Sequence, residues 1–477
     1  MVDTDLLVVG AGAKGVAIAI KAHVLNSLGL GPIDLTIVEE IGPAAAWMDG
    51  NGVTSSREVL AISPSKDIGF PYRSADAFGA AGEEVDRAAL AFSWQQFLVS
   101  VGRYARWVDA GSPPVQRREY GRYLAWVLSR ATDGIRQVHG RAVRLSLSER
   151  ADRWVIDVTG PAGTRRYRCR AFALTGPGIL RSIPHDPEAA PRLLDCDRGR
   201  VKLARVPVQG SSDIAIVGGG ESALSCVEFV RSLRPDARLT IYTPGLPMSR
   251  IESFLENRVF SNPDTVDWAS LSVAVRRDFI ARSDRGVFGP DRVSALGYDE
   301  QSHFVPGRVT HVARGPRGRG VNVSSVSRAG VRKAPHDYVI NCTGFDPLEQ
   351  LRVLLAPEAR VEIQRRVAGL WEGPSEREIA FGRSLELAGM HPRLHLPGPA
   401  ALSQGPGFAN LGSLGLLADR VLGPLCLGAS EDDRGLGDDD RGLGELGDLA
   451  RAGGAPREDH ARLIAGGERD GASPRAL

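Results

Sequence analysis

The most informative segment of the chain is Leu6-Leu7-Val8-Val9-Gly10-Ala11-Gly12-Ala13-Lys14-Gly15. An apolar run enters a glycine turn, and the following residues, 16–22, have the composition of a helix. In this strand-turn-helix order, the pattern G-x-G-x-x-G indicates a dinucleotide site. Gly10 permits the sharp turn, Gly12 lets the backbone approach a pyrophosphate, and Gly15 lets helix and strand pack closely. The helix N-terminus offers free N–H groups to the phosphates.

A second strand is predicted at residues 35–39, and it ends in Glu39. An acid at this place binds the hydroxyl groups of a dinucleotide ribose. The turn and the acid together predict an α/β fold with a Rossmann-like dinucleotide-binding domain.

The composition sets limits on the class of protein. With 477 residues and a formal net charge of +2, the chain has room for two or three domains and has no basic patch that favours nucleic acid. No apolar run is long enough to span a bilayer, and the acidic N-terminus is not a secretory signal. Five scattered cysteines form no C-x-x-C pair, which argues against disulfides and a metal site. We therefore expect a cytoplasmic enzyme without a nucleic-acid or membrane partner.

The region after the first unit is predicted as a long loop over residues 43–67, followed by two amphipathic helices. The helices are expected at 92–107 and 120–131, with their aromatic side chains in the core rather than around a ligand. The clearest strand of the next region is Trp154–Val158.

A second nucleotide fingerprint follows at Gly218-Gly219-Gly220-Glu221-Ser222-Ala223, between a strand at 213–217 and a helix at 224–233. We expect Gly218, Gly220 and Ser222 to contact the second cofactor. The next strand, 239–242, ends in Thr-Pro without an acid, which leaves room for a 2′-phosphate and favours NADP(H) over NAD(H). Arg250 is a candidate partner for that phosphate.

Two late strands, at 337–345 and 394–400, are predicted to return the chain to the first domain. The second Rossmann-like domain is then an insertion, and a small, mainly helical region serves the substrate. The expected division is an FAD-binding domain at 1–207 and 337–429, an NADPH-binding domain with a substrate-contacting segment at 208–336, and a low-complexity tail at 430–477.

Two dinucleotide sites in one chain suit a flavin that stays bound and a nicotinamide that delivers hydride to it. Because no C-x-x-C pair is present, the reduced flavin has no dithiol to receive its electrons. Oxygen, a quinone or a small-molecule acceptor remain as the electron acceptor.

Further motifs succeed one another over roughly residues 1–425. They are Trp47 after the acid, the pair Lys66-Asp67, the helical segments 92–103 and 117–126, the segment 253–260, and Thr343-Gly344-Phe345. With both fingerprints in this order, the chain resembles the N-hydroxylating flavin monooxygenases, the ornithine and lysine N-hydroxylases of siderophore and natural-product pathways.

The resemblance implies that NADPH reduces FAD and that O₂ then forms a C4a-hydroperoxyflavin, which a neutral primary amine attacks. A free amine titrates near about 10.4, so the site must favour its deprotonated form. The resemblance further implies cofactor contacts from Trp47, Gly344 and Asn410. By the same resemblance, Lys66 anchors a substrate carboxylate, Asn257 bonds the substrate, and the protein is a tetramer or dimer.

Several positions depart from the family pattern, and the clearest is Asp284, which stands where the family has an Asn. Its carboxylate repels a substrate carboxylate and attracts an ammonium. Ala61 replaces an expected Gln, Arg258 replaces a Glu, and Lys14 lies within the first glycine turn. We therefore expect the substrate to be an amino acid or diamine other than ornithine.

Two other functions remain open at this stage. One is a flavin monooxygenase acting on carbon or sulfur, against which the chain lacks the F-x-G-x-x-x-H fingerprint between its nucleotide sites. The other is a catalytically degenerate flavoprotein subunit, which would suit Ala61 and the reduced C-terminal motif at 408–415.

Overall fold

The computed structural model describes residues 1–48, 56–196, 212–296, 300–371 and 379–426. The predicted tail at 430–477 lies outside these residues. Within the described ranges, no helix has the length and apolarity needed to cross a membrane.

The first sheet carries the strand that opens the sequence. It has the order β3-β2-β1-β6-β5-β4, and β17 pairs with β6 as well. The strands are β1 (Val2–Val9), β2 (Leu35–Glu39), β3 (Ile135–His139), β4 (Arg141–Leu147), β5 (Trp154–Gly160), β6 (Gly163–Leu174) and β17 (Arg393–His395). β1 runs parallel to β2 and β6, which places the glycine turn beside the carboxyl ends of its neighbours.

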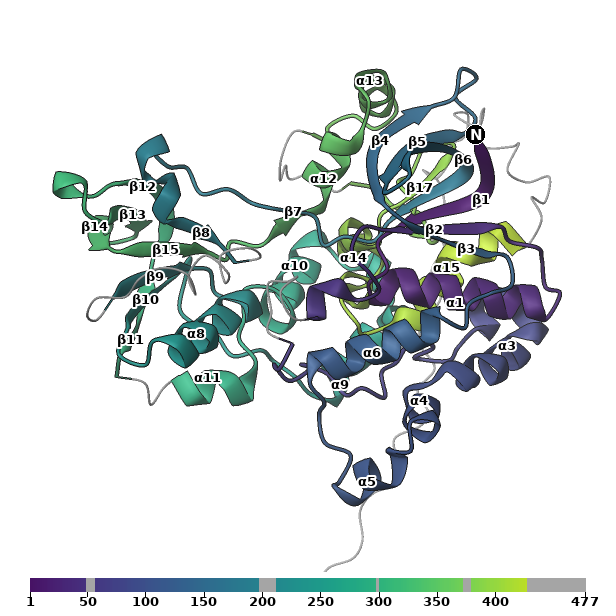
Figure 1. Cartoon of the computed structure of the whole chain (residues 1–477), viewed down its shortest axis with the longest axis horizontal. Coiled ribbons are helices and arrows are strands. Elements are labelled where there is room, and N and C mark those ends of the chain that lie inside the picture. Colours follow the sequence, from purple (N-terminus) through teal and green to yellow (C-terminus); the bar gives the residue numbers. More distant parts are fainter. Residues whose placement is uncertain (49–55, 197–211, 297–299, 372–378, 427–477) are drawn as a thin grey trace, which may run out of the picture. The chain divides into compact units, whose positions relative to one another are not determined.

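Helix α1 (Ala13–Ser27) follows the turn and packs beside α15 (Leu414–Cys426), as Figure 1 shows. Most α1 side chains are buried, because the helix is covered on more than one face. A buried ion pair of 2.8 Å joins Lys21 on α1 to Asp419 on α15. The C-terminal helix therefore completes the domain that the first residues begin.

The second sheet is entirely parallel and has the order β11-β10-β9-β15-β8. Its strands are β8 (Leu193–Asp195), β9 (Asp213–Val217), β10 (Arg238–Thr243), β11 (Ser302–Pro306) and β15 (Tyr338–Asn341). Helix α8 (Glu221–Leu233) follows β9. With β17 returning to the first sheet, the predicted α/β class with two nested Rossmann-like domains is confirmed.

One strand assignment was wrong. The strand predicted at 337–345 does not return to the first domain, because β15 pairs with β9 in the second sheet. β8 also joins this sheet, so strands outside 208–336 belong to it. A short apolar run has the composition of a buried strand in either sheet. Which strand it pairs with depends on the route of the chain between the two sheets, and the composition of the run does not show this.

The helices and smaller sheets fill the remaining chain. A meander of β12 (Arg308–Arg314), β13 (Val321–Ser327) and β14 (Gly330–His336) lies in the chain between β11 and β15 of the second sheet, and β7 (Ile179–Leu180) pairs with β16 (Phe345–Asp346). The other helices are α2 (Ala75–Phe78), α3 (Gly82–Ala89), α4 (Trp94–Ser100), α5 (Tyr104–Asp109), α6 (Arg117–Leu128), α9 (Phe254–Ser261), α10 (Val273–Ser283), α11 (Pro290–Leu296), α12 (Pro347–Leu354), α13 (Pro357–Arg366) and α14 (Pro397–Gln404).

The helix predicted over 92–107 is broken into α4 and α5, because Gly102 adopts a left-handed φ of +68°. The prediction that the aromatic residues of 92–107 and 120–131 lie in the core is confirmed for four of them, which are buried, and wrong for Tyr104, which is exposed. Trp94, Tyr120 and Tyr123 are fully buried, and the Tyr120 and Tyr123 rings lie 5.1 Å apart.

Candidate active site

The first glycine turn has the shape that a dinucleotide phosphate requires. Gly10 has a φ of +101°, and a Cβ on Gly15 would lie 1.9 Å from the Gly10 carbonyl oxygen. No atom lies within 4 Å of a Cβ built on Gly12, so the turn is open at that point. The N-terminus of α1 faces the same space, and the residues present fit the pyrophosphate of FAD.

Glu39 lies at the end of β2, as predicted, but its carboxylate also stabilises the turn. Its oxygens accept hydrogen bonds from the backbone N–H of Ala11 at 2.9 Å and of Ile41 at 3.0 Å. The contact to a ribose stays a prediction.

The second glycine turn is equally restricted. Gly218 has a φ of +150°, and a Cβ there would lie 2.3 Å from the Cys342 carbonyl oxygen. Gly220 is the N-cap of α8, and Ser222 lies in its first turn. β10 ends at Thr243 without an acid. This second turn fits the phosphates of NADPH.

One cavity of about 270 Å³ brings together all three predicted substrate residues and several predicted cofactor residues. Segments far apart in the sequence supply them: the turn Ala45–Trp47, the loop before Asp67, α9, the end of α10 and the segment after α14. The predicted residues in its wall are Trp47, Lys66, Arg250, Asn257, Asp284 and Asn410.

Lys66 and Asn257 are in direct contact in this cavity. The Lys66 ammonium donates to Asn257 Oδ1 at 2.5 Å, while Asn257 Nδ2 donates to the Ser253 carbonyl at 2.8 Å. The Tyr120 hydroxyl donates to the Lys66 carbonyl at 3.2 Å. Both side chains are thus held toward the cavity before any substrate arrives.

The neighbouring Asp67 fixes the loop that carries Lys66. Its buried carboxylate accepts hydrogen bonds from the Trp94 N–H at 2.9 Å, the Gly69 N–H at 3.1 Å and the Tyr72 hydroxyl at 2.8 Å. Burial raises the pKa of this carboxyl, and the hydrogen bonds act against that shift. Asp67 therefore holds the loop in place.

Arg250 lies in the wall of the same cavity. Its guanidinium pairs with Glu252 at 2.7 Å and donates to the carbonyl of Ala61 at 3.3 Å. Burial lowers the pKa of the Lys66 ammonium; the Glu252 carboxylate opposes this shift and Arg250 adds to it. The predicted contact of Arg250 with a nucleotide phosphate stays a prediction.

In the same cavity, Asn410 donates from Nδ2 to Asp284 Oδ1 at 2.9 Å, and its own Oδ1 accepts from the Gly412 N–H at 2.8 Å. Arg285 Nε lies 3.6 Å from the other Asp284 oxygen. Asp284 therefore presents a partly neutralised carboxylate to the cavity.

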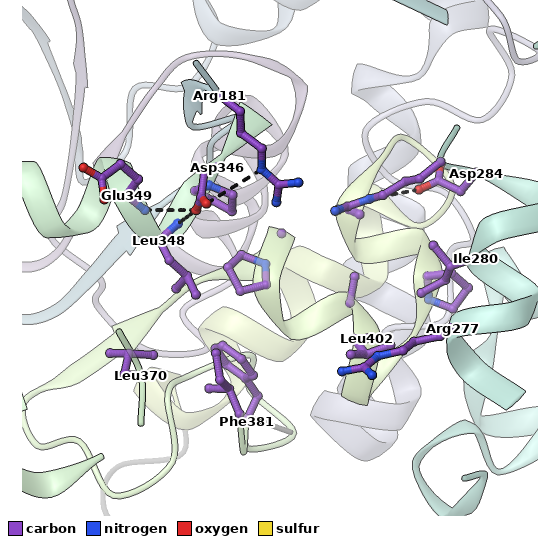
Figure 2. Close-up of a pocket in the computed structure, with 18 of the residues that line it drawn as sticks. Arg181, Arg277, Ile280, Asp284, Asp346, Leu348, Glu349, Leu370, Phe381 and Leu402 are labelled. Carbon is purple, nitrogen blue, oxygen red and sulfur yellow. Dashed lines mark hydrogen bonds and ion pairs between the residues drawn. The ribbon is translucent and has the colours of Figure 1, made fainter. Parts of the chain in front are cut away.

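Asp284 also lines a second cavity of about 760 Å³, shown in Figure 2. α10, α12 and α14 form its walls, with apolar side chains such as Leu348 and Leu402. In its wall, Arg181 Nε points toward an Asp346 carboxylate oxygen at 3.8 Å. No sequence motif predicts this cavity, because the residues that line it come from distant segments of the chain.

The predicted cofactor residue Gly344 lies outside both cavities, and two residues of the smaller cavity were not predicted as site residues. Gly344, with a φ of +91°, accepts a hydrogen bond from the Arg181 N–H and lies in the wall of neither cavity. Glu252 and Arg117 line the cavity of about 270 Å³ but were not predicted as site residues. Arg117 pairs with buried Glu58 at 3.2 Å, and an isolated charged residue in a loop gives no signal of such a pair.

Comparisons with known proteins show which family the chain resembles. The family model for L-lysine 6-monooxygenase/L-ornithine 5-monooxygenase matches residues 88–294. The L-lysine N6-monooxygenase MbtG of Mycolicibacterium paratuberculosis is 35% identical over 425 residues, covering 88% of this chain and 95% of the relative. MbtG of Mycobacterium tuberculosis is 36% identical over 427 residues, with the same coverage.

Two solved structures extend the comparison. The lysine monooxygenase NbtG of Nocardia farcinica is 34% identical with a TM-score of 0.74, covering 88% of this chain and 99% of that one. The ornithine N-hydroxylase KtzI of Kutzneria is 18% identical with a TM-score of 0.70, covering 89% and 99%, a likeness of fold.

Proposed function

Because the chain belongs to the family of flavin-dependent L-lysine 6-monooxygenases and L-ornithine 5-monooxygenases, we propose that it hydroxylates the side-chain amine of L-lysine at N6. FAD and NADPH are its cofactors, and O₂ is the second substrate. The product would serve siderophore or other natural-product biosynthesis. Membership of this family excludes the function on carbon or sulfur that the sequence left open.

The observation that carries the choice of substrate is that Lys66 and Asp284 both line one cavity of about 270 Å³. An α-amino acid carries one carboxylate and one ammonium. The cavity wall holds three cations and four carboxylates. Because Arg250 and Arg117 already pair with Glu252 and Glu58, we assign Lys66 to the substrate carboxylate and Asp284 to the ammonium. The relatives more than 30% identical are named for lysine, which supports the longer amino acid.

In this proposal, Lys66 binds the substrate carboxylate. The Asn257 side-chain amide forms a hydrogen bond with the substrate. Asp284, held by Asn410, binds the α-ammonium. Fixing both groups at one end leaves the N6 amine as the free end of the side chain. The reacting amine is then placed by its distance from the anchored end.

The amine must lose its proton before it can react. Burial favours the neutral amine, as it does for Lys66 itself, whose pKa burial lowers. Apolar side chains in the wall, such as Leu60 and Phe260, help exclude water. When bound, FAD reduced by NADPH supplies the activated oxygen.

The two glycine turns supply the cofactor contacts. We propose that the first sheet binds FAD through Gly10, Gly12, Gly15 and Glu39, and the second binds NADPH through Gly218, Gly220 and Ser222. We further propose that the enzyme is cytoplasmic and forms a homo-oligomer, a tetramer or a dimer.

The test is NADPH consumption by the purified yellow protein, with hydroxylamine product and H₂O₂ measured in parallel for L-lysine, L-ornithine and cadaverine. We expect N6-hydroxylysine from L-lysine at a kcat/KM at least tenfold above that for the other two. A preference for another amine contradicts the choice of L-lysine. Flavin retention without hydroxylamine from any amine would support the degenerate-subunit hypothesis instead.

A further inference from the structure

Lys14 is an unusual residue for its position. It is the second residue of α1, within the glycine turn, yet its ammonium donates to the carbonyl of Ala409 at 2.8 Å across 395 positions of sequence. Among the described residues, no carboxylate lies within ion-pair distance of this ammonium. Its contact is therefore a hydrogen bond from the cofactor turn to a distant segment.

The residues that follow Ala409, 410–412, line the cavity of about 270 Å³ in which we propose that the amine binds. Asn410 follows Ala409 directly and donates to Asp284 at 2.9 Å. Asn410 and Asp284 both line the cavity, whereas Lys14 does not. A continuous path thus leads from the turn through Lys14, the Ala409–Asn410 peptide and the Asn410 amide to Asp284.

The charge of Lys14 is sensitive to its surroundings. Burial lowers the pKa of the ammonium to about 8, the Arg285 charge acts in the same direction, and Asp284 opposes it. The sequence of the contacted segment, 406–412, contains no titratable side chain, nor do the neighbouring residues of α1 at 13–17. A phosphate bound at the turn would favour the charged form, and a charged donor makes the stronger bond to a carbonyl.

We propose that Lys14 is a positioning residue that couples FAD binding at the glycine turn to amine binding in the cavity, through the Ala409–Asn410 segment. The inference rests on the proposed function for the identity of the amine. Bound phosphate strengthens the Lys14 bond, the bond fixes Asn410, and Asn410 holds Asp284 toward the substrate ammonium. By linkage, the amine must then tighten FAD binding by the same factor.

The test measures FAD dissociation constants by flavin fluorescence, with and without saturating L-lysine and without NADPH, so that no turnover occurs. In the wild-type protein we expect L-lysine to tighten FAD binding about tenfold, within the usual range of coupling between sites. Lys14→Arg keeps the charge and should retain most of this effect. Lys14→Met removes the ammonium and should reduce it to less than twofold.

Melting temperatures of the apo-proteins show whether the variants fold. Should Lys14→Met not fold, Lys14→Gln, which keeps a donor without the charge, takes its place with the same expected loss. A wild-type protein without coupling, or a Lys14→Met or Lys14→Gln variant with full coupling, overturns the inference.

The two proposals fail separately. Hydroxylation of L-lysine together with unchanged coupling in Lys14→Met contradicts only the role of Lys14. Absence of hydroxylamine from L-lysine contradicts the proposed substrate, and the titration is then run with whichever amine the enzyme hydroxylates.

Discussion

The Lys66 ammonium bonds the side-chain oxygen of Asn257 at 2.5 Å, although 191 positions separate the two residues. The loop fixed by Asp67 and the helix α9 thereby meet in one cavity. This contact presents a cation and an amide that are already ordered. A substrate carboxylate therefore does not have to organise them on binding.

Removing the Lys66 ammonium should weaken amino-acid binding. Hydrogen bonds to charged groups contribute about 1.5–3 kcal/mol, so Lys66→Ala is expected to raise the KM for L-lysine by about 10- to 100-fold. The KM for cadaverine, which lacks the carboxylate, should change little. Lys333→Ala, at an exposed position of β14, is the control and should behave as wild type. Equal losses for L-lysine and cadaverine would contradict the assigned contact.

Asp284→Asn tests the contact assigned to the α-ammonium. The amide keeps the size of the side chain but loses the charge that attracts an ammonium. We expect the KM for L-lysine to rise about tenfold, with FAD content unchanged. Steady-state kinetics with L-lysine and its α-N-acetyl derivative, which has no α-ammonium, measure the effect. If both compounds respond alike, Asp284 does not bind the α-ammonium.

The anchoring of the carboxylate should depend on pH. Since burial lowers the pKa of Lys66 below that of an exposed lysine, the charge is present below the lowered pKa and lost as the pH rises through it. The ratio of the KM values for L-lysine and cadaverine should therefore rise with pH, whereas titration of the reacting amine cancels in the ratio. Lys66→Arg, which keeps its charge up to about pH 12, should give a smaller rise than the wild type, because only the titration of the α-ammonium then contributes. A flat wild-type profile would speak against Lys66 as the anchor.

Gly15→Ala should abolish FAD binding. The added Cβ would lie 1.9 Å from the Gly10 carbonyl oxygen, so the turn must open and its N–H groups move. Flavin absorbance per mole of purified protein measures the loss. Gly245→Ala, where no atom lies within 4 Å of the new Cβ, is the control and should stay yellow.

Gly218→Ala should affect the second cofactor separately. Gly218 lies in the turn just before α8, and its added Cβ would lie 2.3 Å from the Cys342 carbonyl oxygen. We expect FAD content to stay normal while the rate of flavin reduction at a fixed NADPH concentration falls at least tenfold. Stopped-flow absorbance under anaerobic conditions measures it. Loss of FAD in this variant would contradict the assignment of the turns.

Much of the fold could be predicted because its signals are local. Short stretches of sequence contain both glycine turns, the acid at the end of β2 and the missing acid after β10. Each glycine of a turn can be interpreted because a side chain at its position would strain the backbone or block a close approach. Errors arose where partners are distant. The run Tyr338–Asn341 was assigned to the first sheet, yet it pairs with β9 in the second.

Local sequence patterns were enough to predict the α/β class, two dinucleotide turns and the residues that resemble a known substrate site. The folded chain was needed to show that Lys66, Asn257, Asp284 and Asn410 share one cavity. It was also needed to show that Asn410 holds Asp284 and that Lys14 reaches Ala409. The physical reason is the range of the forces. Turn geometry depends on a few adjacent residues, whereas a cavity is made by packing and hydrogen bonds between segments that hundreds of residues separate.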